Sequence, residues 1–111
     1  MEIREHQVGA VAVLEPRGAL VEDAGALLRD RVVDLHRKQL GRLAIDAGGV
    51  PYIDSLGLEA LLDASEVLID SGRSLKLCGA CETVREVLDL VGLASVVEQY
   101  ENVQDAVRSF L

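Results

Sequence analysis

The stretch "LAIDAGGVPYIDSLGLEALL", residues 43–62, decides the fold because it runs from an apolar strand through a loop into a helix. Leu43-Ala44-Ile45 is a short, wholly apolar run, which is typical of a central strand covered on both faces. Residues 46–50 read as a loop, and Gly48-Gly49 supplies its turn chemistry. The sequence therefore predicts a buried strand followed closely by a helix that begins at Ser55.

The helix predicted from Ser55 to near Gly72 has two different faces. Apolar residues recur along it with helical spacing, and Ser65 lies inside their stripe. These apolar positions are Leu58, Leu61, Leu62, Leu68 and Ile69. The opposite face carries Glu59, Asp63, Glu66 and Asp70. The pattern predicts that the stripe is buried. The acidic face could bind a metal or a basic partner, but a solvated helix face is favoured.

Outward from this stretch, strand-like and helix-like segments alternate along the chain. Two strands with a turn at Val8-Gly9 come first, then a helix that begins near Glu22-Asp23 and ends before Gly41. Later segments predict a helix stopped by Gly92 and a last helix capped by Asn102. The predicted strands are Ile3–His6, Ala10–Glu15, Leu43–Ile45, Leu75–Cys78 and Val96-Val97. The last two helices carry the apolar faces Val84, Val87, Leu88, Val91 and Val103, Ala106, Val107, Phe110.

This order, a hairpin followed by strand–helix units, determines the expected architecture. Strands joined through helices run parallel with right-handed crossovers. The fold class is therefore α/β: a small mixed β-sheet with an N-terminal hairpin and about four packed α-helices. At 111 residues the chain fits a single domain, residues 1–111, with a sizeable core.

The charge of the chain excludes several classes of partner. With 19 acidic and 11 basic residues, the formal net charge is −8, so the surface repels phosphate backbones and anionic membrane faces. Direct nucleic-acid binding is therefore not expected. The apolar stretch Val8–Leu14 is far shorter than the ~20 residues of a spanning helix, so membrane insertion is not expected either. A charged N-terminus without a signal-peptide apolar region predicts a cytoplasmic protein with reduced thiols.

Ser55 admits two interpretations at the start of its helix. In the first it is the N-cap, whose hydroxyl accepts a hydrogen bond from a first-turn N–H, so that replacing it by Ala costs about 1 kcal/mol. In the second its exposed hydroxyl is phosphorylated, because a helix start tolerates an anion and a phosphate adds about −1.5 to −2 charges beside Asp54. Gly57 costs helix stability in the first turn, and its use there is close approach to the backbone.

Other candidate chemistry is weaker. Cys78 and Cys81 form a C-x-x-C pair, but no Trp precedes it and no proline follows Cys81. A buried strand cysteine followed by a residue at a helix start is therefore favoured over a redox pair. Two cysteines and the distant His6 and His36 do not indicate zinc, and neither histidine has a nucleophile nearby in sequence. No cofactor and no metal are expected, and no enzymatic activity.

The residues around Ser55 resemble the STAS domain family, which includes bacterial anti-sigma factor antagonists and related domains of sulfate transporters. The family marker is a short apolar strand with an acidic or amide residue, a loop, then Asp-Ser/Thr, a variable residue, and Gly before an apolar residue. Residues 43–46 match the strand end, and Asp54, Ser55, Gly57 and Leu58 match the core of the marker. The likeness covers almost the whole chain, including the hairpin, "GAL" at residues 18–20 and "LDLVGL" at residues 88–93.

The resemblance implies an STAS-like fold and a regulatory role without catalysis. In antagonists of this family, the Ser after the Asp is phosphorylated by a partner anti-sigma factor that is itself a serine kinase. The unphosphorylated domain binds the anti-sigma factor and frees the sigma factor, and a PP2C-type phosphatase restores this form. By this likeness Ser55 is the phosphoacceptor, Asp54 orients its hydroxyl and Gly57 allows the partner's close approach. The implied partner-binding residues are Asp46, Asp54, Ser55, Leu56, Gly57, Leu58 and Glu59.

Two positions depart from the family pattern. Many antagonists carry an acidic residue where this chain has Val21, with Glu22 and Asp23 next to it, and Ser or Thr where it has Leu56. Ser55 is therefore the only hydroxyl in the core of the marker. Two alternatives stay open: a STAS-type scaffold subunit of a transporter or other multiprotein complex that binds constitutively, and a thiol oxidoreductase that uses the two cysteines.

Overall fold

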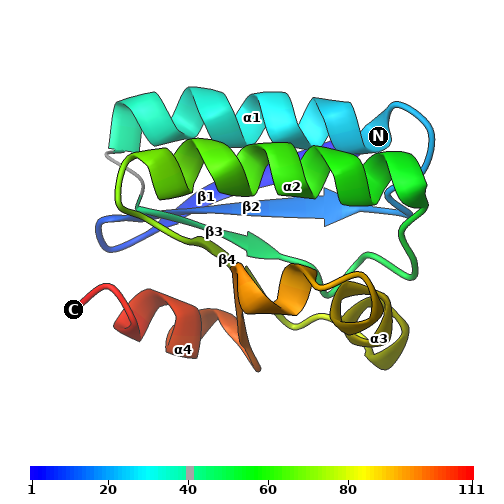
Figure 1. The fold of residues 1–111 in the computed structure, drawn as a ribbon. Coiled ribbons are helices and arrows are strands. Elements are labelled where there is room, and N and C mark those ends of the chain that lie inside the picture. The colour runs from blue at the N-terminus through cyan, green and yellow to red at the C-terminus, as the bar shows by residue number, and fades with distance from the viewer. Residues whose placement is uncertain (40–41) are drawn as a thin grey trace.

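A computed structural model describes residues 1–39 and 42–111, and these form a five-stranded sheet with four α-helices (Figure 1). The strands are β1 (Glu2–Val8), β2 (Val11–Arg17), β3 (Leu43–Asp46), β4 (Leu75–Cys78) and β5 (Val97–Tyr100). The helices are α1 (Ala24–Gln39), α2 (Ser55–Asp70), α3 (Glu82–Leu90) and α4 (Val103–Arg108), with a 3-10 turn η1 (Leu93–Ser95) before β5. The predicted fold class is confirmed. None of the described helices has the length and apolar character that a membrane crossing requires.

The strands lie side by side in chain order. β1 and β2 form an antiparallel hairpin, in which Glu2 faces Arg17 and Val8 faces Val11. β2, β3, β4 and β5 run parallel, as expected for strands joined through helices. The carboxyl ends of β2, β3 and β4 therefore meet at one end of the sheet, and the loops that lead into α1, α2 and α3 all leave from that end.

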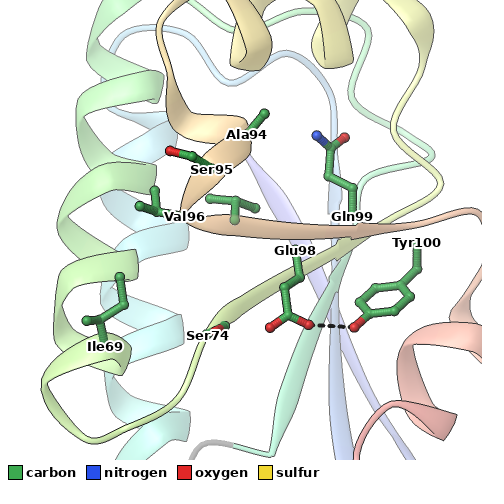
Figure 2. A pocket seen from close by; sticks show the side chains of 9 residues that line it. Ile69, Ser74, Ala94, Ser95, Val96, Glu98, Gln99 and Tyr100 are labelled. Carbon is green, nitrogen blue, oxygen red and sulfur yellow. Dashed lines mark hydrogen bonds between the residues drawn. The ribbon is translucent and has the colours of Figure 1, made fainter.

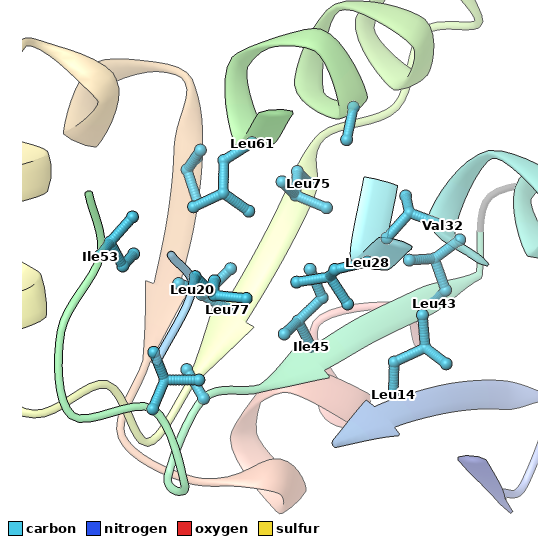
Figure 3. Close-up of a cluster of buried hydrophobic side chains, with 14 of the residues drawn as sticks. Leu14, Leu20, Leu28, Val32, Leu43, Ile45, Ile53, Leu61, Leu75 and Leu77 are labelled. Atoms are coloured by element: carbon cyan, nitrogen blue, oxygen red, sulfur yellow. The ribbon is translucent and has the colours of Figure 1, made fainter. Parts of the chain in front are cut away.

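The two faces of the sheet are covered unequally. α1 and α2 lie together on one face, and α4 lies on the other (Figure 1). The main core lies under α1 and α2, where Leu28 and Val32 of α1 meet Leu43 and Ile45 of β3 (Figure 3). Since burying one Leu or Ile side chain stabilises a fold by about 1.5–3 kcal/mol, this face supplies most of the burial energy. The cluster under α4 is far smaller, with the buried residues Ala44, Cys78 and Ala106.

The buried face of α2 differs from the predicted stripe. Leu61 and Leu68 are buried as predicted, but Leu62 and Ile69 are 39% and 45% exposed, so their predicted burial is wrong. The cause is α1, which packs alongside α2 and buries its small residues instead. Gly57 and Ala60 of α2 lie against Gly25 of α1. The acidic residues of the opposite face are exposed, as predicted.

Boundaries in the N-terminal half shift by one or two residues. The turn of the hairpin follows Val8, because Gly9 takes a left-handed conformation, φ +61°, and Val8 stays in β1. α1 begins at Ala24, so Glu22-Asp23 precede the helix and are not its first turn. The predicted stop before Gly41 falls on a residue outside the described part of the chain.

The C-terminal third follows the prediction more closely. α3 ends at Leu90, and Gly92 stops it in a left-handed conformation, φ +79°. Val91, predicted on the apolar face of α3, follows the last helical residue and is exposed. The last strand begins one residue later than predicted, at Val97. Asn102 caps α4 as predicted, since its Oδ1 accepts a hydrogen bond from the Asp105 N–H at 2.8 Å.

Candidate functional site

The start of α2 lies at the carboxyl end of the sheet, where binding sites of open α/β folds are usually found. Asp54 is its N-cap: the residue is extended, φ −92° and ψ −178°, and its Oδ1 accepts a hydrogen bond from the Gly57 N–H at 2.8 Å. The prediction that Ser55 is the N-cap is therefore wrong. Ser55 is the first helical residue, because the carboxylate one position earlier reaches the free N–H groups of the first turn.

The second oxygen of Asp54 binds a different part of the chain. Its Oδ2 accepts a hydrogen bond from the Glu22 N–H at 2.8 Å, just before α1. Glu22 holds a left-handed backbone conformation, φ +57°, which points this N–H at the carboxylate. The Glu22 and Gly57 N–H groups together lower the pKa of Asp54, so its carboxylate is charged at neutral pH. One side chain thus joins the starts of α1 and α2.

Backbone hydrogen bonds hold the same two loops together. The Leu20 N–H donates to the Tyr52 carbonyl at 3.0 Å, and the Asp54 N–H donates to the Leu20 carbonyl at 3.1 Å. Leu20 and Ile53 form a parallel bridge outside the main sheet. The position of Ser55 is therefore fixed from both sides of the Asp54 cap.

Gly57 is buried, and its predicted role in a partner's close approach stays a prediction. A Cβ at this position would overlap the Leu20 carbonyl oxygen and lie 2.7 Å from Ile53 Cγ2. The close approach that Gly57 permits is internal: it lets the first turn of α2 rest on the Leu20 loop and on Gly25 of α1. Glycine is needed here for packing within the domain.

Ser55 and Leu56 lie on the surface beside this cap. Ser55 is exposed, and Leu56 is 55% exposed. Leu56 and the exposed Glu59 line a shallow groove between the first halves of α1 and α2. Its charged lining residues are Glu22, Asp23, Glu59, Asp63 and Arg29. The groove is acidic, and its Arg29 already pairs with Asp63 at 3.6 Å.

The two remaining predicted site residues have internal contacts. Leu58 is half-buried and packs against the main core. Asp46 ends β3, and its Oδ1 accepts a hydrogen bond from the Gly48 N–H at 3.0 Å, which shapes the turn after the strand. The structure therefore brings Ser55, Leu56 and Glu59 together on one surface, with Asp54 supporting them, while Asp46, Gly57 and Leu58 shape the loops and helix beneath.

Comparison with known proteins gives the family of the chain. The family model of the STAS domain matches residues 2–106. The chain belongs to the STAS domain family. No curated protein sequence matches it.

Solved STAS domains share the fold of this one at low sequence identity. The Thermotoga maritima protein TM1081 is 24% identical, with a TM-score of 0.85 over 96% of this chain and 92% of that one. The anti-sigma factor antagonist SpoIIAA has been solved unphosphorylated, with 14% identity, TM-score 0.71 and coverage of 98% and 96%. Its phosphorylated form from Bacillus has 17% identity, TM-score 0.71 and coverage of 99% and 100%. The murine anion transporter Slc26a9 matches with 18% identity and TM-score 0.74, over 93% of this chain but 18% of the transporter.

Sequence reasoning missed three residues that build the site of this STAS domain. Glu22 supplies the N–H for Asp54, Leu20 supplies the carbonyl under Gly57, and Gly25 gives α1 room beside α2. Two signals in the sequence point to them: the "GAL" at residues 18–20, and a glycine near the start of both α1 and α2. Neither signal says that these segments meet, because the contacts join positions more than thirty residues apart.

The two cysteines of the STAS domain differ in environment. Cys78 is buried, as predicted for a strand cysteine, and burial followed by the charge of Asp46 raises its pKa to about 11. Cys81 is exposed, and its Sγ lies 3.6 Å from the carbonyl oxygens of Val50 and Pro51. Both thiols are free. A raised thiol pKa is the opposite of what a dithiol redox centre needs, which disfavours the oxidoreductase alternative.

Proposed function

We propose that this STAS domain is an anti-sigma factor antagonist. Its unphosphorylated form binds an anti-sigma factor that is also a serine kinase and so releases the sigma factor; phosphorylation at Ser55 ends the binding, and a PP2C-type phosphatase reverses it. The observation that carries the proposal is the exposed residue Ser55 at the first position of α2, next to the N-cap that the Asp54 carboxylate provides. The domain itself acts as a binding partner and catalyses nothing.

The Asp54 cap makes a switch at Ser55 compatible with a stable fold. Because Asp54 satisfies the first-turn N–H, the helix start does not depend on the Ser55 hydroxyl. A phosphate would sit at the positive end of the 16-residue α2, which offsets part of its added charge of about −1.5 to −2. The modification would therefore change the charge and bulk of the surface while the domain stays folded.

The surface around Ser55 supports a partner that brings apolar and basic groups. Leu56 offers an exposed apolar side chain next to Ser55, and Glu59 and Asp23 line the acidic groove beside it. A docked partner would cover Leu56 and contact Ser55 at the same time. A phosphate on Ser55 would then repel or displace a surface that fits the bare hydroxyl.

The test is phosphorylation by the cognate kinase-type anti-sigma factor. The protein is incubated with the kinase and ATP, and its intact mass is measured. One phosphate adduct is expected, and Ser55→Ala should abolish it. Ser95→Ala, at another exposed serine, is the matched control and should keep the adduct. No adduct on the natural protein, or an adduct that survives Ser55→Ala, contradicts the proposal.

A binding measurement is the second test of the proposed switch. Ser55→Asp should weaken binding of the kinase markedly in calorimetry, while the melting temperature changes little because Asp54 still caps α2. Equal affinity of Ser55→Asp and the natural protein would contradict a switch at this residue.

The match to part of an anion transporter favours a second candidate, a scaffold subunit that binds constitutively. Such a subunit would copurify with components of a membrane complex, and Ser55→Asp would leave that association unchanged. Affinity purification with both forms therefore separates the two functions.

A further inference from the structure

α4 covers the sheet face opposite α1 and α2 with very little apolar contact. The helix has six residues, Val103–Arg108, and lies on β3, β4 and β5. Ala106 is the fully buried residue of α4, and it packs on Ala44 and Cys78. Small side chains of this kind contribute little burial energy. A six-residue helix is also too short to be stable in water without tertiary contacts.

A buried lysine contacts one aromatic residue before α4 and one after it. Lys76 of β4 is 8% exposed, and its Nζ donates a hydrogen bond to Glu98 Oε1 at 2.9 Å. The Tyr100 hydroxyl donates to the same oxygen at 2.5 Å, as Figure 2 shows. Nζ lies 5.4 Å from the centre of the Tyr100 ring, before α4, and 4.7 Å from that of Phe110, after it. We call Lys76, Glu98, Tyr100 and Phe110 the lysine clasp.

Within the lysine clasp, Lys76, Glu98 and Tyr100 belong to β4 and β5, and the contact that joins the sheet to the segment after α4 is the Phe110 ring over the Lys76 ammonium. A buried ammonium needs charged or aromatic partners, and cation–π contacts strengthen as the amine loses water. The ion pair within the helix, Arg108 to Asp105 at 3.5 Å, is exposed and adds little. The attachment of α4 therefore depends on a small apolar cluster and one cation–π contact, whereas α1 and α2 are attached by a large apolar core.

We propose that residues 101–111 form a strap that opens from the sheet as a local unit, with the contact of its Phe110 ring on the Lys76 ammonium as its latch, while the α1 and α2 face stays folded. Opening uncovers the Lys76 ammonium and the Cys78 thiol, and so gives the domain a second surface that is present only in the open state. Local openings of this kind, well below the cost of global unfolding, are expected where few apolar contacts hold an element.

Cys78 reports on the strap directly. Its side chain lies under Ala106, and its Sγ contacts the Ile45 carbonyl oxygen at 3.5 Å. With the strap closed the thiol is buried and protonated at pH 8, because its pKa is raised to about 11. With the strap open it becomes an ordinary accessible thiol that reacts with a disulfide reagent.

The experiment follows labelling of Cys78 by 5,5′-dithiobis(2-nitrobenzoate) at pH 8 in Cys81→Ser protein, over a range of urea below the unfolding transition. Labelling is expected to be faster than global unfolding permits and to depend only weakly on urea, because a local opening exposes little surface. Phe110→Leu, which keeps an apolar side chain but removes the ring, should speed labelling about tenfold. Lys76→Met should have a similar effect.

The controls separate the strap from general destabilisation. Leu90→Ala, at a side chain that is 85% exposed on α3, should leave the labelling rate unchanged. Hydrogen exchange of α1 and α2 should stay the same in Phe110→Leu. The proposal is overturned if labelling shows the full urea dependence of global unfolding, or if Phe110→Leu speeds labelling only as much as it lowers global stability. If Lys76→Met does not fold, the labelling rate of Cys78 in Phe110→Leu is sufficient to test the proposal.

Discussion

α2 and α3 begin at the same end of the sheet, each after a parallel strand, but their starts are built differently. Both N-cap residues have extended backbones: φ −92° and ψ −178° at Asp54, φ −71° and ψ 167° at Cys81. The Asp54 carboxylate binds the Gly57 N–H, whereas the Cys81 side chain makes no capping hydrogen bond. The backbone geometry of a helix start is therefore independent of whether a side chain stabilises it.

The two starts also differ in what they are attached to. Asp54 reaches Glu22 before α1, so the first turn of α2 is fixed to a second helix. The Cys81 thiol, a weak donor, lies 3.6 Å from the loop carbonyls of Val50 and Pro51. This difference supports the proposal that Ser55 is the regulated residue. Ser55 is presented at a constant position because its neighbours, and not its own hydroxyl, hold the helix in place.

The largest expected effect that tests this contrast is that of Gly57→Ala, which adds a methyl group where the Leu20 carbonyl and Ile53 Cγ2 approach α2. We expect a loss of about 1–3 kcal/mol in the free energy of unfolding, measured by urea denaturation, because the methyl overpacks this contact. Thr83→Ala, at an exposed position in the first turn of α3, is the matched control and should stay within about 0.5 kcal/mol. If Gly57→Ala leaves the free energy of unfolding unchanged, the loop before α1 moves to make room for the methyl group. The start of α2 then tolerates substitution as well as the start of α3 does.

A smaller effect, dependent on pH, is expected for Asp54→Asn. The Glu22 N–H, and after it the Gly57 N–H, lower the pKa of Asp54 in the folded state below its unfolded value of about 3.9. The ionised carboxylate therefore stabilises the fold above pH ~4, and this contribution is lost as the pH falls through the folded pKa. The natural protein should be more stable than Asp54→Asn at pH 7, and the gap should narrow toward pH 3.

Thermal unfolding at both pH values measures that gap. Thr83→Ala has no titrating group, so its difference from the natural protein should be the same at pH 7 and pH 3. A constant gap for Asp54→Asn as well would show that the charge of Asp54 does not strengthen its two hydrogen bonds.

The order of elements could be predicted from the sequence because it depends on local periodicity. The apolar run Leu43–Ile45 and the helical stripe after Ser55 are short-range patterns, and both elements are present. The set of α2 residues that are buried could not be predicted, because it depends on which other helix packs against α2. Leu62 and Ile69 have the right spacing for burial, but α1 packs on the glycine and alanine side instead.

The sequence predicted where Ser55 lies in the fold, but it did not predict the contacts that hold the start of α2. The motif located Ser55 at a helix start, and the structure places it there, exposed. Its cap was assigned to the wrong residue because serine and aspartate are equally good N-caps in sequence statistics. The deciding contacts, Asp54 with Glu22 and Gly57 with Leu20, are tertiary and leave no local pattern.

The smallest effect concerns the start of α3. Cys81→Ser places a hydroxyl on a backbone that already has N-cap geometry, so the side chain can accept a hydrogen bond from a first-turn N–H. The gain should be about 0.5–1 kcal/mol in urea denaturation, less the weak thiol contacts to Val50 and Pro51. Phosphorylation at Ser55 should not change, because α3 does not contribute to the Asp54 cap. If Cys81→Ser instead lowers the free energy of unfolding, the thiol contacts to the loop before α2 contribute more stability than a serine cap would. The starts of α2 and α3 would then depend on each other through residues 50–51.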